Sequence, residues 1–304
     1  MNKVSIIDEN KTSHFEFSKS QKLEAQRNML MFENPLDKSI IDSGIIGGAE
    51  FEFYINAFDL EHFDEELTTL LDDLSRITDQ DILCNPFKDF TRSKEYDKLI
   101  IKPDSSLRSY TYGLEITTPI VPIVHLPYYL GHILSIIQKR GYITDTSTGL
   151  HLHLSCPEKE SKDFDFLGLM LLLNAKKLYD SWPPRPDYSR NVMNVLNCLD
   201  FESASGKKDE VGRGWCIIRP DYEDKKNHIE IRTMGGENYQ SKYSEQIFPE
   251  LRTILQSYID ILNHDADDQC DRLKAMQKQK VKTHSDEDQA KMYDTLTIIG
   301  VTQG

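Results

Sequence analysis

The chain has 304 residues, 38% of them hydrophobic, and a formal net charge of −14 at pH 7. This length and composition suit a folded protein with a packed core, while the acidic excess argues against binding bare nucleic acid or an anionic membrane, which need a basic surface. Small or cationic partners fit this charge better, and five widely spaced cysteines without a CxxC pair indicate a reduced, cytoplasmic protein.

The first elements that we expect are an extension, a strand and a helix. Residues 1–44 are polar and weakly patterned, and their start lacks the apolar stretch of a signal peptide. The apolar run at 46–55 predicts a strand, and leucines at helical spacing within 60–80 predict an amphipathic helix. Segments 96–103 and 110–121 then predict two strands joined by a turn.

Helices and strands alternate in the rest of the chain. A helix at 126–141, closed by Gly141, is followed by a strictly alternating strand at 147–155. The later elements are an apolar helix at 163–181, a proline-rich loop at 181–191, strands at 214–220 and 228–234, and a helical segment from 241 to about 280.

This order of elements predicts an α+β fold with a mainly antiparallel sheet. We expect one domain at 45–240, preceded by an N-terminal extension at 1–44 and followed by a C-terminal helical extension and tail at 241–304. No apolar run is long enough to cross a bilayer.

Several predicted strands carry polar residues on one face and apolar residues on the other. Side chains at positions i and i+2 of a strand share a face. The same-face pairs are Glu50 with Glu52, His151 with His153, and Glu230 with Arg232, and Glu115 has the corresponding place on the strand at 110–121.

The polar faces have two explanations. An antiparallel sheet commonly turns one apolar face to the core and one polar face to water, which would make each pair an ordinary surface feature. A solvated face usually mixes Lys, Thr, Ser and Gln, however, whereas these strands gather carboxylates and imidazoles. Because clustered carboxylates repel one another, the pattern favours a site for divalent cations such as Mg²⁺ or Mn²⁺.

Four motifs follow one another along the chain: GAEFEF, YGLEITTP, TGLHLHLS and HIEIRT, with the turn DSSL at 104–107 before the second. Together they resemble the signature strands of the carboxylate–amine ligases, the glutamine synthetase and glutamate–cysteine ligase superfamily, and most closely its amidoligase branch. The resemblance implies a curved sheet, with helices on one face, around an ATP and metal site. It also implies that ATP phosphorylates a carboxylate and that an amine then attacks the acyl phosphate.

The resemblance further implies two sets of ligands, each for one Mg²⁺ or Mn²⁺ ion. Glu50, His151 and Glu230 match the positions that hold the metal on the nucleotide side. Glu52 and Glu115 match ligands of the metal beside the acceptor carboxylate.

Other matched positions contact the nucleotide or the transferred phosphoryl group. His153 and Ser155 match nucleotide-contacting residues. Arg232, together with Arg213 or Arg219, matches arginines that neutralise the phosphoryl group. That role agrees with the chemistry, because phosphoryl transfer is catalysed mainly by positioned cations.

The chain departs from glutamine synthetase in two ways. No carboxylate lies in the segment ITTPIVPIVHL that follows Glu115, so the second metal either has fewer protein ligands or recruits one from elsewhere, and Asp104 is a candidate. The N-terminal domain that completes glutamine synthetase sites between subunits is also not recognisable, so we expect a monomer or dimer.

Two rival functions remain open. A metal-dependent hydrolase could hold Zn²⁺ with the His151 and His153 pair, completed by His228 or His264. A non-catalytic nucleotide-binding module could keep the same fold without turnover. The sequence names neither the carboxylate nor the amine that a ligase would join.

Overall fold

The computed structural model describes residues 12–88, 96–107, 112–159 and 227–263, the single residues 169, 173, 178, 180–183 and 185, and the backbone of 217–218. The chain divides into two compact units. The first comprises Met1–Leu154 with Met234–Phe248, and the second comprises Ser155–Thr233 with Pro249–Gly304. Each unit is therefore built from two separate stretches of chain.

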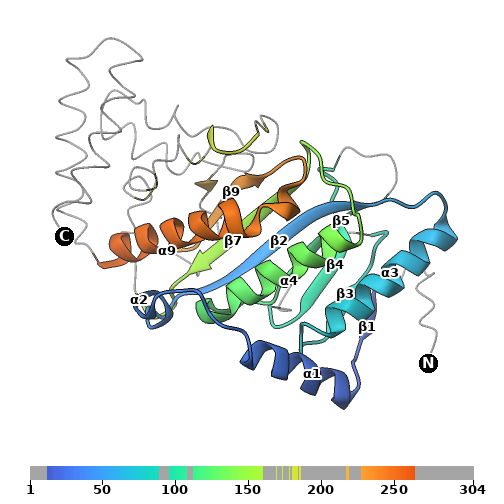
Figure 1. Ribbon diagram of the computed structural model, residues 1–304, viewed down its shortest axis with the longest axis horizontal. Helices are drawn as coiled ribbons and strands as arrows, with labels where there is room; N and C mark the ends of the chain where they lie inside the picture. The colour runs from blue at the N-terminus through green and yellow to red at the C-terminus, as the bar shows by residue number, and fades with distance from the viewer. Residues whose placement is uncertain are drawn as a thin grey trace, which may run out of the picture. The chain divides into compact units, whose positions relative to one another are not determined.

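The first unit has an α+β fold with a mixed, mostly antiparallel sheet (Figure 1). Among the pairs whose register is described, β3 with β4 is parallel and the others are antiparallel. The strands are, in spatial order, β1 (Ser13–Phe15), β3 (Ile82–Cys84), β4 (Leu99–Pro103), β5 (Tyr112–Thr117), β2 (Ile46–Ile55) and β7 (Gly149–Ser155), with β6 (Val121–Pro122) paired to β2.

These strands confirm the predicted α+β class and correct its finer description. The sheet is open and uncurled, whereas the resemblance implied a curved one. The predicted strand at 46–55 is confirmed by β2, and the predicted pair of strands at 96–103 and 110–121 is confirmed by the antiparallel register of β4 and β5. The edge strand β1 and its neighbour β3 were not predicted, because three residues are too few to show a period of two.

Helices pack on one side of this sheet, where α4 (Leu126–Lys139) lies against β2, and α3 (Leu60–Ser75) lies against α4 and α1 (Lys19–Leu30) (Figure 1). The side chain of Asp59 caps α3 by accepting a hydrogen bond from the His62 N–H at 2.8 Å. The chain leaves α4 through Gly141, whose φ of +67° favours glycine. Two short elements, α2 (Lys38–Ile41) and η1 (Ile123–His125), complete this part of the unit.

The core lies between the sheet and these helices. Phe51 and Phe53 of β2 and Leu114 and Ile116 of β5 are each fully buried. The register places Phe51 opposite Ile116 and Phe53 opposite Leu114, so they share one face. The intervening residues of both strands therefore point to the other face, as the sequence predicts.

The return segment, Met234–Phe248, completes the first unit with a 3₁₀ turn, η3 (Tyr239–Ser241), and a π-helical turn, η4 (Tyr243–Ile247). Tyr239 is fully buried, and its hydroxyl donates to the Glu52 carbonyl at 2.9 Å. The Tyr243 hydroxyl donates to the Pro127 carbonyl at 2.9 Å. These bonds attach the segment to β2 and to the start of α4.

The second unit contains the antiparallel pair β8 (Ile217–Ile218) and β9 (Ile229–Gly235), which confirms the predicted last pair of strands. Buried Asn227 joins three parts of this unit. Its amide nitrogen donates to the Cys156 carbonyl at 2.8 Å, and its own carbonyl accepts a 2.6 Å bond from Tyr258 of α9 (Phe248–Asn263). Most of the predicted helix at 163–181 and of the loop at 181–191 lies outside the described residues. Among the described helices, none is long and apolar enough to cross a membrane.

Candidate metal centre

Charged residues face one another across three neighbouring strands of the first unit. The register places Lys102 of β4 opposite Glu115 of β5, and Glu115 opposite Glu52 of β2. Glu52 is 1% exposed and Glu115 is 5% exposed. Like charges directly opposite each other destabilise a sheet, and burial increases that cost. A buried cross-strand pair of carboxylates therefore indicates a function that needs both charges.

Asp104 adds a third carboxylate from the turn after β4. Its Oδ1 accepts a hydrogen bond from the Ser106 N–H at 2.7 Å, and its carbonyl accepts one from the Leu107 N–H at 3.2 Å. One oxygen from each of Glu52, Asp104 and Glu115 lies within 4.8 Å of the others. Because Mg²⁺ and Mn²⁺ prefer carboxylate oxygens, this donor set fits a divalent cation of that kind.

The Glu115 side chain is held by its neighbours. The Thr117 hydroxyl donates to Glu115 Oε1 at 2.6 Å, and Lys102 Nζ lies 3.7 Å from the same oxygen. Burial, followed by the charge of Glu50, raises the pKa of Glu115 to about 8, although Lys102 and the Thr117 hydrogen bond oppose this shift. Without a metal, Glu115 therefore keeps its proton at neutral pH.

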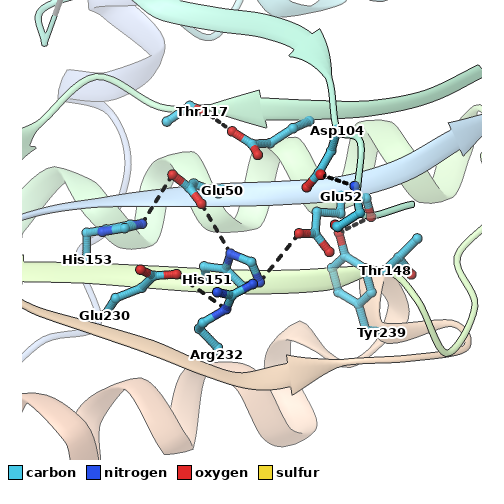
Figure 2. Close-up of polar contacts among 12 residues, drawn as sticks. Glu50, Glu52, Asp104, Thr117, Thr148, His151, His153, Glu230, Arg232 and Tyr239 are labelled. Carbon is cyan, nitrogen blue, oxygen red and sulfur yellow. Dashed lines mark hydrogen bonds and ion pairs between the residues drawn. The ribbon is translucent and has the colours of Figure 1, made fainter. Parts of the chain in front are cut away.

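Two imidazoles of β7 contact the carboxylates of β2 (Figure 2). His151 lies between them, with Nδ1 at 3.1 Å from Glu50 Oε2 and Nε2 at 3.5 Å from Glu52 Oε1. His153 Nε2 lies 3.3 Å from the other oxygen of Glu50. Burial alone would raise the pKa of Glu50, but the charge of His153 and hydrogen bonds from both imidazoles hold it well below its usual range.

Burial decides between the two explanations of the polar face. Glu52, Glu115 and His151 are all buried, whereas an ordinary solvated sheet face would expose them. Buried ionisable groups in contact with one another, with pKa values shifted in opposite directions, are characteristic of functional sites.

The first unit thus brings together five of the predicted site residues and the candidate Asp104. Ser155, Glu230 and Arg232 belong to the second unit, where Ser155 Oγ donates to Asn227 Oδ1 at 3.2 Å and Arg232 Nε lies 3.4 Å from Glu230 Oε1. The roles that the resemblance implies for these three stay predictions. Arg213 and Arg219 lie outside the described residues.

Sequence reasoning missed two neighbours of the site, Lys102 and Tyr239. Lys102 is placed opposite Glu115 only once the pairing of β4 with β5 is known. Tyr239, which fixes the backbone of Glu52, lies 187 residues further along the chain. The alternation within the strand does place Thr117 on the face of Glu115, but no local signal identifies Tyr239.

A scan against protein-family models finds no match, and a search of curated proteins also finds none.

Leu107, on the turn that carries Asp104, lies close to Gly113. A Cβ added at Gly113 would lie 2.9 Å from Leu107 Cδ1 and 3.0 Å from Leu107 Cβ. Gly113→Ala should therefore push Leu107 away and shift Asp104, lowering the Mn²⁺ affinity roughly 10-fold, as supporting residues of metal ligands do. Isothermal titration calorimetry would measure this change.

Ser105→Ala is the matched control, because Ser105 is exposed on the same turn. An unchanged Mn²⁺ affinity in Gly113→Ala would mean that the turn does not position a ligand.

Proposed function

We propose that the protein is an ATP-dependent ligase that uses Mg²⁺ or Mn²⁺ to join a carboxylate to an amine through an acyl phosphate. The convergence of buried Glu52 and Glu115 with Asp104 carries this proposal. Such a group is costly to fold unless a cation neutralises it. The order of the motifs along the chain supports the choice of reaction.

In this proposal Glu52, Asp104 and Glu115 hold the cation beside the acceptor carboxylate, and Asp104 supplies the carboxylate that is missing after β5. Glu50 and His151 hold the cation on the nucleotide side. The bound cations would reduce the repulsion between two anions, the acceptor carboxylate and the polyphosphate. The buried protein groups would hold both in place and keep water from the acyl phosphate.

The two chemical steps balance without another reactant. An oxygen of the acceptor carboxylate attacks the γ-phosphorus of ATP, and ADP leaves. The amine nitrogen then attacks the acyl carbon, phosphate leaves, and the nitrogen gives up a proton. We propose a cytoplasmic monomer or dimer with small or cationic amine donors, in keeping with the net charge of −14.

Hydroxylamine tests the reaction because it accepts many acyl phosphates. The full-length protein, incubated with ATP, Mg²⁺ or Mn²⁺ and pooled carboxylic acids, should release ADP and form a hydroxamate. Glu52→Gln should lose both products. Glu65→Gln is the matched control, since Glu65 is exposed on α3, and it should behave like the wild type.

Bond cleavage without ATP, with zinc in the purified protein, would instead support the hydrolase. Nucleotide binding without turnover across the pools would support the binding module.

A further inference from the structure

Among the residues whose strand register is described, Lys102 is the one positive charge aligned with the two buried glutamates. It lies opposite Glu115, which lies opposite Glu52, and it precedes Asp104 by two residues. Its side chain is 24% exposed, against 7% for Glu115 and 1% for Glu52. Of these three aligned groups, Lys102 is therefore the one that a solute arriving from water would meet first.

Holding Glu115 in place does not account for Lys102. The 3.7 Å from Nζ to Oε1 exceeds hydrogen-bond length, and the Thr117 hydroxyl already bonds the same oxygen at 2.6 Å. A partly exposed ion pair of this length contributes little to stability. This ion pair with Glu115 does not by itself explain a positive charge at this position.

The charge balance of the cluster indicates what that charge is for. Three ionised carboxylates and one divalent cation leave a net charge of −1, which would repel an anionic substrate. Lys102 brings the sum to zero. A lysine ammonium is also a compact point charge that binds carboxylate and phosphoryl oxygens.

We propose that Lys102 binds an oxyanion of the substrate, a carboxylate or phosphoryl group, that also ligates the cation held by Glu52, Asp104 and Glu115. This inference rests on the proposed function and assigns a substrate-binding residue to it. The lysine and the cation would contact different oxygens of the same anionic group. Lysine and cation would then each strengthen the binding of that group.

The test measures the coupling between cation and anion, without turnover. Free Mn²⁺ is followed by electron paramagnetic resonance while the full-length protein is titrated, with and without inorganic phosphate or acetate as the anion. Only the Mn²⁺ binding that disappears in the Glu52→Gln variant is counted. By linkage, an anion that binds both Mn²⁺ and Lys102 must tighten Mn²⁺ binding, and we expect at least about a 5-fold effect.

Lys102→Met should separate the two contributions. Without the competing positive charge, Mn²⁺ alone should bind about 3- to 10-fold more tightly, while the anion should change the Mn²⁺ affinity less than about 2-fold, below the usual range of coupling. Lys102→Arg should keep the coupling, and Lys38→Met, an exposed lysine elsewhere in the unit, should match the wild type. Coupling by phosphate would identify a phosphoryl group, and coupling by acetate the acceptor carboxylate.

Two outcomes would overturn the inference in different ways. If the wild type binds Mn²⁺ but neither anion tightens it, or if Lys102→Met keeps the coupling, Lys102 does not bind the substrate while the ligase proposal stands. If the wild type binds no Mn²⁺, the proposed metal-dependent function fails and the role of Lys102 fails with it.

Discussion

Glu115→Gln should stabilise the metal-free protein by a few kcal/mol at alkaline pH and leave its stability nearly unchanged under acidic conditions. The folded-state pKa of Glu115 is raised from 4.5 to about 8, so the folded protein holds this proton more tightly than the unfolded chain does. The resulting stabilisation is fully present below pH 4.5, declines between those two values, and is gone above about 8. Glutamine resembles the protonated acid and does not lose that contribution.

Urea denaturation of the metal-free wild type and variant between about pH 5 and 9 would measure the difference in unfolding free energy. The pKa of Glu50 is shifted downward, so its effect on stability falls at lower pH than this window. Glu65→Gln should follow the wild type at every pH. A gap between wild type and Glu115→Gln that does not widen as pH rises would contradict the buried, protonated state of Glu115.

The affinity for Mn²⁺ should depend on pH for the same reason. Below about pH 8, binding the cation must displace the proton of Glu115, so the affinity should rise roughly 10-fold per pH unit and level off above that value. Glu115→Gln should bind weakly and lose this proton-linked slope. Calorimetric titrations in buffers of different ionisation enthalpy would count the protons released.

Asp104→Asn is the informative comparison. It removes a ligand without removing the proton of Glu115, so it should lower the Mn²⁺ affinity, by at least about 10-fold, while keeping the pH dependence. If the two variants gave the same pH profile, the proton displaced by the metal would not be that of Glu115.

The sequence predicted those elements that are long and strongly periodic. β2 and α4 repeat apolar residues over ten or more positions and are found where the pattern places them. The strands β1 and β3 add the N-terminal segment to the sheet, but each is only three residues long. Their pairing depends on contacts between distant parts of the chain, which local patterns do not contain.

The candidate site also has features that the sequence predicted and features that it could not. Alternation along each strand identified Glu50, Glu52, Glu115, His151 and His153 as members of polar faces. The burial of Glu52, Glu115 and His151 could not be predicted, because alternation cannot distinguish a covered polar face from a solvated one. The alignment of Lys102, Glu115 and Glu52 depends on the strand order and register. Neither can be read from the pattern of a single strand.

The first unit is completed by the return segment Met234–Phe248, and this has a consequence for biosynthesis. Tyr239 and Tyr243 belong to this unit, yet the ribosome makes them only after residues 155–233 of the other unit. At about 5–20 residues per second, that interval lasts on the order of 4–16 s. During this time the backbone carbonyl of Glu52 in a nascent N-terminal half lacks its hydrogen bond from Tyr239. A fragment that stops at Leu154 should therefore be less stable than the intact chain and should depend more on chaperones.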